Sequence, residues 1–150
     1  MRMINIVISI AFVWSTLSPT FAQPTKTMNT YLTALRTSDW DAAEQCWTQE
    51  AVSASKHLGI IFTDFPPKYD NASPLVTHHD AIASGQAMVN IGNTITYENY
   101  CKIPVTVFIG KDSTTTSYFL EQIEDRWQIT SPLFLFTRDW QTLETEYSIL

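Results

Sequence analysis

A long stretch of alternating residues, 94–110, constrains the fold of this chain more than any other feature. Its odd positions are apolar from Ile95 to Ile109 with one exception, Asn99, and its even positions are mixed. Alternation with a period of two is typical of a β-strand with one buried face. A strand of this length would span ~50 Å and could not stay flat. Pro104 has no N–H and indicates a bend, a bulge or a sheet edge. We therefore predict one long curved strand that wraps a core.

The residues before this strand predict mostly helices. Apolar residues at helical spacing predict a helix over 27–37, and Asp39 is placed to cap a second helix over 40–47. The segment 50–59 fits either a helix or an opening strand, and we favour the helix. The smaller expected elements are a short strand at 59–62, an exposed loop over 66–73 and a short strand at 75–77. A helical turn over 80–86, capped by Asp80, and a connecting segment over 87–90 then lead into the long strand.

The residues after the long strand predict a meander of antiparallel strands. We expect a turn at 110–112, a return strand over 113–123, a turn at 124–126 and a third strand over 127–136. The third strand has apolar residues on both faces, which indicates that it is covered on both sides or forms an interface. The order of helices first and strands later predicts an α+β domain, with N-terminal helices packed on a strongly curved antiparallel sheet.

The first 22 residues have the pattern of a secretory signal peptide. Arg2 gives a positive start, an apolar run extends from Ile4 to Leu17, and Ala22 stands at a suitable cleavage position. A membrane anchor is the alternative, but the run is short and polar residues interrupt it. We expect a secreted or periplasmic protein with four parts: a signal peptide (1–22), a leader (23–26), one domain (27–138) and a C-terminal tail (139–150).

Charge and cysteine content limit the partners of the chain. The formal net charge is −6, and loss of Arg2 with the signal peptide would make it −7. The sequence has no basic footprint for nucleic acid, so we expect no nucleic-acid partner. Cys46 and Cys101 allow one disulfide, which export would permit. A buried free thiol at Cys101, on the apolar face of the long strand, is the equal alternative.

Two segments, YLTALRTSDWDAA (31–43) and YFLEQIEDRWQI (118–129), resemble the opening helices and the penultimate hairpin of the nuclear transport factor two-like superfamily. The superfamily includes ketosteroid isomerases, polyketide cyclases, dehydratases and non-catalytic binding domains. The likeness covers 27–50 and 94–136 and fails across 56–93. It implies a cystatin-like cone, in which a strongly bent sheet and its helices enclose a pocket. A fold that hosts so many activities does not choose among them.

The resemblance also allows a comparison with the isomerases residue by residue. Tyr31 matches the tyrosine that donates a hydrogen bond to the developing oxyanion. The carboxylate base of those enzymes falls at Ser55, and the acid that partners the tyrosine falls in 117–120, which has no acid. Proton abstraction needs a base within hydrogen-bond reach, and Ser55 cannot serve alone. The comparison therefore favours a non-catalytic domain.

Few residues stand out as ligand contacts. Tyr31 is the one candidate for catalysis. His78 and His79 would point to opposite faces of a strand, so they do not predict a metal site, and we expect no cofactor. The candidates for lining a pocket are Tyr31, Leu35, Trp47, Tyr97, Val105 and Phe119.

Three functions are compatible with these observations. The first is a domain that binds a small apolar ligand or a protein, and the missing base favours it. The second is an isomerase, dehydratase or cyclase in which Tyr31 acts with a His or Asp from the loop. The third is an accessory module, either a homodimer through the apolar face at 133–136 or a part of a longer protein.

Overall fold

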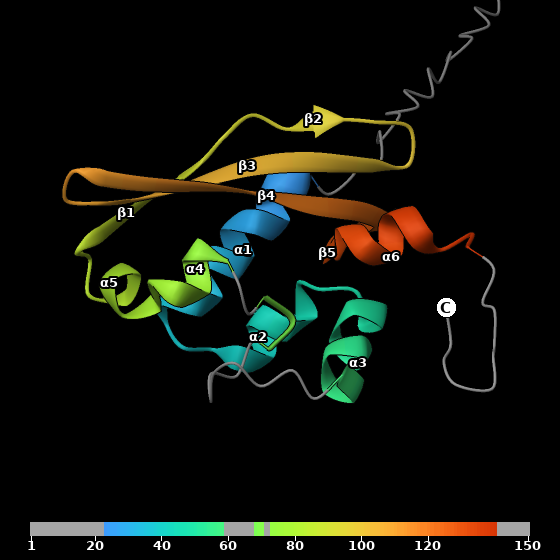
Figure 1. Cartoon of the computed structure of the whole chain (residues 1–150), viewed down its shortest axis with the longest axis horizontal. Helices are drawn as coiled ribbons and strands as arrows, with labels where there is room; N and C mark the ends of the chain where they lie inside the picture. The colour runs from blue at the N-terminus through green and yellow to red at the C-terminus, as the bar shows by residue number, and fades with distance from the viewer. Residues whose placement is uncertain (1–22, 59–67, 71–72, 141–150) are drawn as a thin grey trace, which may run out of the picture.

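Helices pack on one face of an antiparallel sheet in the computed structural model, which describes residues 23–58, 68–70 and 73–140 (Figure 1). The predicted α+β class with a curved sheet is confirmed. None of the helices in these ranges is long and apolar enough to cross a membrane. In chain order the elements are α1 (Pro24–Arg36), α2 (Trp40–Gln45), α3 (Gln49–Leu58), a 3-10 turn η1 (Lys68–Asp70), α4 (Pro74–Thr77), α5 (His79–Ala83), β1 (Ala87–Ile91), β2 (Ile95–Thr96), β3 (Tyr100–Ile109), β4 (Asp112–Ile123), β5 (Arg126–Thr130) and α6 (Pro132–Thr137).

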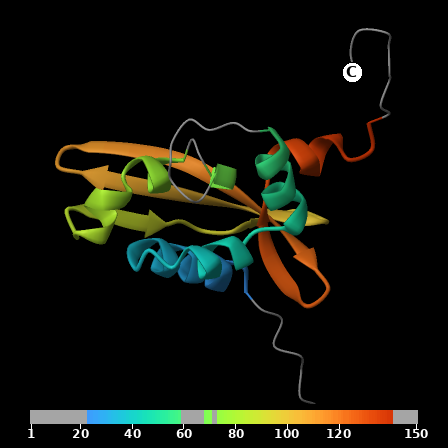
Figure 2. The same cartoon turned by 90° about the horizontal axis from the view of Figure 1, so that it is seen from below.

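The sheet has the order β1-β3-β4-β5, and β2 also pairs with β3. All pairs are antiparallel. Figure 2 shows the β4–β5 hairpin turned away from the long axis of β3 and β4, which gives the sheet its strong curvature. The face predicted to be apolar is the buried one, because the odd residues of β3 pack against α1 and the other helices: Cys101, Ile103, Val105 and Val107.

The prediction of one continuous strand over 94–110 is wrong. The chain reverses after β2, and the Tyr97 amide donates to the Tyr100 carbonyl at 2.8 Å. As a result β2 folds back on β3, with Ile95 opposite Lys102. Asn99, the one exception to the alternation, lies in this turn. Alternation records which face a side chain occupies, and a tight hairpin preserves it, so the pattern alone could not reveal the reversal.

Pro104 interrupts the ladder as expected. In register, β1 covers β3 from Val105 to Ile109 and β2 covers Cys101 and Lys102, so Pro104 falls between the two partners. There the Gly92 amide donates to the Pro104 carbonyl at 2.8 Å. A Cβ at Gly92 would stand 2.8 Å from Pro104 Cγ, so this close approach requires glycine. The missing N–H of proline thus costs no strand-to-strand hydrogen bond.

The N-terminal helices follow the sequence pattern closely. Helix α1 begins at Pro24, so residues 24–26 of the expected leader are helical, because proline is favoured at the first helical position. The cap at Asp39 is confirmed, since its carboxylate accepts from the Ala42 amide at 3.1 Å. Helix α3 confirms the helical interpretation of 50–59. The expected strand at 59–62 lies outside the described residues.

Two Ser-Pro pairs start helices where strands were predicted. Ser73 caps α4, which replaces the expected strand at 75–77, and Ser131 caps α6, so the third strand ends at Thr130 instead of Phe136. A serine cap followed by proline at the first position is a strong helix start, and it outweighs a short apolar run. Helix α5 begins one residue before Asp80, which therefore does not cap it.

Candidate functional site

A buried carboxylate, Asp70, joins four separate segments under the inner face of the sheet. The hydroxyls of Tyr31 on α1 and Tyr118 on β4 each donate to Asp70 Oδ2 at 2.7 Å. The Ser73 hydroxyl donates to the same oxygen at 2.8 Å. Asp70 itself ends η1 and is only 7% exposed. We call these four residues the Asp70 cluster.

Local structure explains how the donors reach this point. Tyr31 belongs to the apolar stripe of α1 that packs on the sheet. Tyr118 lies opposite Ile103 in the β3–β4 ladder and so faces the same interior. The Ser73 hydroxyl both accepts from the Val76 amide at 3.3 Å, as the cap of α4, and donates to Asp70. A core helix, the sheet and a helix cap therefore fix the carboxylate from three directions.

The Asp70 carboxylate has neutral hydroxyl donors but no cationic partner. Burial raises its pKa to about 6, and the hydrogen bonds from Tyr118, Tyr31 and Ser73 offset part of that rise because they favour the charged form. All three donors contact Oδ2. Within the described ranges no donor contacts Oδ1, and no Lys, Arg or His forms an ion pair with this residue. At neutral pH most molecules therefore carry a buried negative charge at Asp70 that no described side chain compensates.

The tyrosines of this region stay protonated. Burial first, and then the negative charge of Asp70, raise the pKa of Tyr31 and of Tyr118 well above its ordinary value. Burial is also the main cause of the raised pKa of Tyr69, with smaller contributions from the charges of Glu44 and Asp70. Tyr31 and Tyr118 are consequently permanent hydrogen-bond donors to Asp70 over the physiological pH range.

Trp47 packs against the tyrosines of the cluster. Its ring centroid lies 5.9 Å from that of Tyr31, 6.3 Å from that of Tyr118 and 5.1 Å from that of Tyr69. Its position is set by the sheet edge, because the residues on either side of it bond to Ile129 of β5. The Trp47 Nε1 atom is buried and has no hydrogen-bond partner in the described part of the chain. An orphan buried N–H costs ~1–3 kcal/mol, so this donor calls for an explanation.

The structure brings together only some of the predicted pocket residues. Tyr31 and Trp47 are in contact, and Leu35 and Val105 belong to the same buried core. Tyr97 is 44% exposed and stacks on Tyr100, with 4.5 Å between the ring centroids. Phe119 alternates with the inward-facing Tyr118 and so lies on the outer face of the sheet, where it contacts Tyr100 and Phe136.

The central residue of the site, Asp70, was missed by sequence reasoning. The segment 66–73 was predicted to be an exposed loop, yet Asp70 and Ser73 are buried. A short segment with two prolines has no periodicity from which burial can be inferred. The one available signal was an acid placed three residues before a Ser-Pro helix start. Ser55, the position compared with the isomerase base, lies on α3 and donates to the Val52 carbonyl at 2.7 Å.

The remaining candidates have structural contacts. A ring nitrogen of His79, Nε2, lies 2.8 Å from the Leu35 carbonyl oxygen, and no group of three or more metal-ligating side chains occurs among the described residues. Cys46 and Cys101 are buried free thiols, the alternative to the disulfide. Burial raises the pKa of each thiol to about 11, so both stay protonated at neutral pH.

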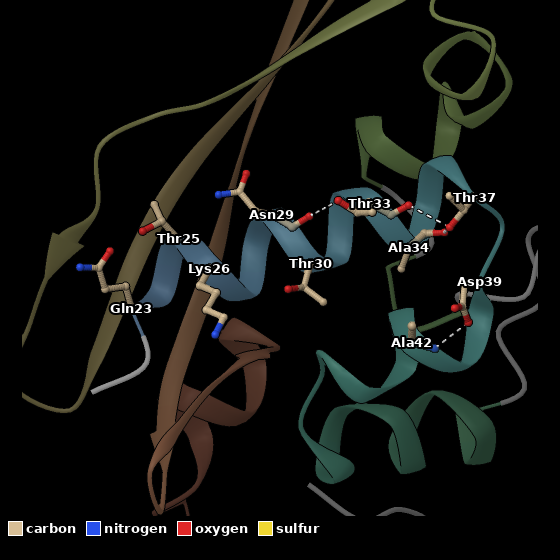
Figure 3. Close-up of a pocket in the computed structure, with 10 residues that line it drawn as sticks. All are labelled: Gln23, Thr25, Lys26, Asn29, Thr30, Thr33, Ala34, Thr37, Asp39 and Ala42. Atoms are coloured by element: carbon tan, nitrogen blue, oxygen red, sulfur yellow. Dashed lines mark hydrogen bonds between the residues drawn. The ribbon is translucent and has the colours of Figure 1, made fainter. Parts of the chain in front are cut away.

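Two cavities adjoin the described helices. The first, of about 490 Å³, lies on the solvent side of α1 and α2 (Figure 3). Two of its four threonines already bond to the helix backbone, because the Thr33 hydroxyl donates to the Asn29 carbonyl at 2.8 Å and that of Thr37 to the Thr33 carbonyl at 3.1 Å. The second, of about 510 Å³, lies between α2, α3 and β5 and is bounded by Trp47. The second cavity is therefore the one that adjoins the ring group around Asp70.

Comparisons with known proteins found similarity only among solved structures. No protein family and no curated protein matches the sequence. The structure is similar to a Campylobacter jejuni protein described provisionally as an NTF2-like transpeptidase, with a TM-score of 0.49 and 13% identity over 73% of this chain and 99% of that chain. It is also similar to an NTF2-like protein of unknown function from Shewanella oneidensis, with a TM-score of 0.39 and 16% identity over 71% of this chain and 95% of that chain. Both of these proteins are described as NTF2-like, which is the superfamily that residues 31–43 and 118–129 resemble.

Proposed function

We propose that this protein is a secreted or periplasmic domain of the nuclear transport factor two-like fold that binds a small ligand at the Asp70 cluster. One observation carries the proposal. A carboxylate that is only 7% exposed is held through one oxygen, while the other oxygen has no donor among the described residues. Buried charges are normally paired, and a shifted carboxyl beside aromatic rings is typical of a binding or catalytic site.

The orphan N–H of Trp47 supports the same location. The indole N–H is a buried donor with no partner among the described residues. Asp70 Oδ1 accepts no hydrogen bond from those residues, and both groups lie at the packed rings of Trp47, Tyr31 and Tyr118. A ligand with a largely apolar body would add to the ring contacts, and its polar group would meet the buried polar atoms. The Asp70 cluster thus combines an apolar ring surface with a few buried polar atoms, which are the two features that small-ligand sites require.

Ligand-observed nuclear magnetic resonance of the purified mature protein tests this proposal. A library of small polar aromatic and alicyclic compounds should give hits that Asp70→Asn abolishes. Asp112→Asn, a change of the same kind at an exposed acid, should leave the hits unchanged. Hits that persist in Asp70→Asn would place the binding site elsewhere, and the absence of any hit with a folded wild-type protein would argue against a small-ligand function.

Proton-transfer catalysis of the isomerase kind is the second candidate. Two observations favour it. Tyr31 contacts Asp70, and the hypothesis required a His or Asp from the loop beside Tyr31. The pKa of Asp70 is also raised to about 6. A base with a pKa near the working pH is suited to remove a proton from carbon. Deuterium exchange next to the carbonyl of a bound ketone, abolished by Asp70→Asn, would support catalysis. Binding without exchange would support the non-catalytic function.

Localisation and self-association are further parts of this proposal. N-terminal sequencing of the protein from an exporting host should find cleavage after Ala22. The outer face of the sheet carries a ring group of Tyr97, Tyr100, Phe119 and Phe136, and the neighbouring Leu133 is 58% exposed. Exposed apolar surface of this kind is typical of an interface, and a homodimer is the partner that we expect there.

A further inference from the structure

We infer that the Asp70 cluster selects an organic cation, that is, a small ligand in which an ammonium group is attached to an apolar body. This inference rests on the proposed ligand-binding function and adds the chemical class of the ligand. It starts from a charge that the described residues leave uncompensated. Asp70 has three neutral hydroxyl donors and no cationic side chain in contact with it.

The hydrogen bonds around Asp70 favour the charged carboxylate over the neutral acid. Tyr31, Tyr118 and Ser73 can each turn a hydroxyl hydrogen toward Oδ2, and all three do so. A charged carboxylate held in this way would not raise the affinity for a neutral or anionic ligand, because the buried charge would stay unpaired, which is costly. A bound ammonium would supply the missing positive charge and would donate to the vacant Oδ1.

The aromatic surroundings also favour a cation. The rings of Tyr31, Trp47, Tyr69 and Tyr118 form one contiguous group, with neighbouring centroids 5.1–6.3 Å apart. The faces of tyrosine and tryptophan attract ammonium groups, most strongly where water is excluded. The same rings provide apolar contact for the body of the ligand. Three of these four ring contacts are edge-to-face, and we place the body of the ligand at the border of the group, where Trp47 also bounds the second cavity.

The cavity next to Trp47 is also lined by more negative than positive side chains, which again favours a cation. Trp47 bounds the cavity of about 510 Å³, whose walls carry the carboxylates of Asp41 and Glu44 and one guanidinium, Arg126. The chain as a whole has a formal net charge of −6. Such a field raises the local concentration of cations and opposes the entry of anions. Anionic ligands such as fatty acids are therefore the class that this site should reject.

Three compounds of similar shape and different charge test the inference: benzylamine, benzyl alcohol and benzoate. Isothermal titration calorimetry of the mature protein should show benzylamine binding most tightly and benzoate not at all. In Asp70→Asn the affinity for benzylamine should fall about thirtyfold or more, which is the usual effect of removing one partner of a buried charge pair. Asp112→Asn should bind benzylamine as the wild-type protein does, because its side chain is exposed and far along β4 from Tyr118.

A second measurement needs no variant and covers the case in which Asp70→Asn fails to fold. The groups that face Asp70 are the hydroxyls of Tyr31, Tyr118 and Ser73, with Tyr69 beside it, and the tyrosines stay protonated through the range used. The affinity for benzylamine should fall about tenfold from neutral pH to about pH 5, because a proton competes for Asp70. Calorimetry near pH 6 in buffers of different ionisation enthalpy should show that protons are released on binding.

The outcomes separate this inference from the function on which it rests. Tighter binding of benzyl alcohol or benzoate than of benzylamine, lost in Asp70→Asn, would overturn the cation preference and leave the ligand site in place. Benzylamine binding without proton release, or equally strong in Asp70→Asn, would show that Asp70 does not hold the ammonium. No binding of any of the three compounds to the folded wild-type protein would overturn the inference, while the library experiment would still decide the proposed function.

Discussion

The hydroxyl of Tyr31 donates to Oδ2 of Asp70 at 2.7 Å, although the two residues are 39 positions apart in the chain. This contact joins the opening helix, where the sequence resembles a known family, to the segment where that resemblance fails. Tyr31 therefore contacts an acid at position 70, whereas residues 117–120 contain no acid. The Asp70 cluster can therefore be tested by removing its donors and its acceptor one at a time.

Substitution of Tyr31 by Phe should lower the free energy of unfolding by ~1.5–3 kcal/mol, because it removes a hydrogen bond to a buried charged group and keeps the ring. Urea denaturation followed by circular dichroism measures the change. Tyr97→Phe is the matched control, since that tyrosine is partly exposed and lies outside the cluster. Equal denaturation midpoints for the two variants would contradict the role assigned to the Tyr31 hydroxyl.

Stability should rise as the pH falls from 7 toward 4. The pKa of Asp70 is about 6 in the folded protein and 3.8 as the ordinary value, so the folded state binds the proton more tightly. Between these two values folding takes up a proton, and the free energy of unfolding increases by roughly 2–3 kcal/mol on acidification. The gain is complete below about pH 4 and is absent above about pH 6.

Asp70→Asn isolates this contribution from those of the other carboxyl groups. The difference between the wild-type and variant free energies of unfolding should vary with pH over the interval from 6 to 4. Urea denaturation at several pH values gives both curves. Parallel curves would show that the pKa of Asp70 is not raised in the folded protein.

Asp39→Ala should lower the free energy of unfolding by ~1 kcal/mol, because the carboxylate of Asp39 caps α2 by accepting from the Ala42 amide. Asp39→Asn should retain most of the stability, since an amide oxygen can accept the same hydrogen bond. Thermal denaturation compares the two variants. Equal losses would indicate that the charge of Asp39, and not its cap, is what matters.

Arg138 links α6 to the sheet and to α3. Its guanidinium donates to both carboxylate oxygens of the buried Glu121, at 3.0 and 3.2 Å, and to Glu50 at 2.8 Å. Arg138→Met should cost ~1–2 kcal/mol, less than a fully buried pair because the Arg138 side chain is half exposed. Adding Glu121→Gln should restore part of the stability, since no buried unpaired carboxylate then remains and Glu50 is half exposed. A double variant less stable than Arg138→Met would contradict this account.

Self-association should depend on the exposed ring group at the end of the sheet. Phe136→Asp places a charge beside Tyr100 and Phe119, and it should convert a homodimer to a monomer in sedimentation equilibrium. Met88→Asp is the control, because Met88 is also a large exposed apolar residue and lies on the distant edge strand β1. A wild-type protein that is monomeric at high concentration would refute the dimer.

Much of the fold could be read from local patterns. The apolar face of residues 101–107, the cap at Asp39 and the turn between β3 and β4 all depend on residues close together in the chain. The same patterns misled at Ser73 and Ser131, where Ser-Pro pairs start helices. These errors have one origin, because a short apolar run suits a strand and a helix equally well and the capping residues decide between them.

The sequence by itself determined the α+β order, the buried face of the central strand and the helix that carries Tyr31. Only the tertiary structure decided that the chain reverses at residues 97–99, that Phe119 faces outward and that Asp70 meets Tyr31 and Tyr118. The physical reason is the separation along the chain over which each effect acts. Periodicity and capping act within a few residues, whereas the environment of a buried carboxylate is set by donors that only the packing of distant segments brings within 3 Å.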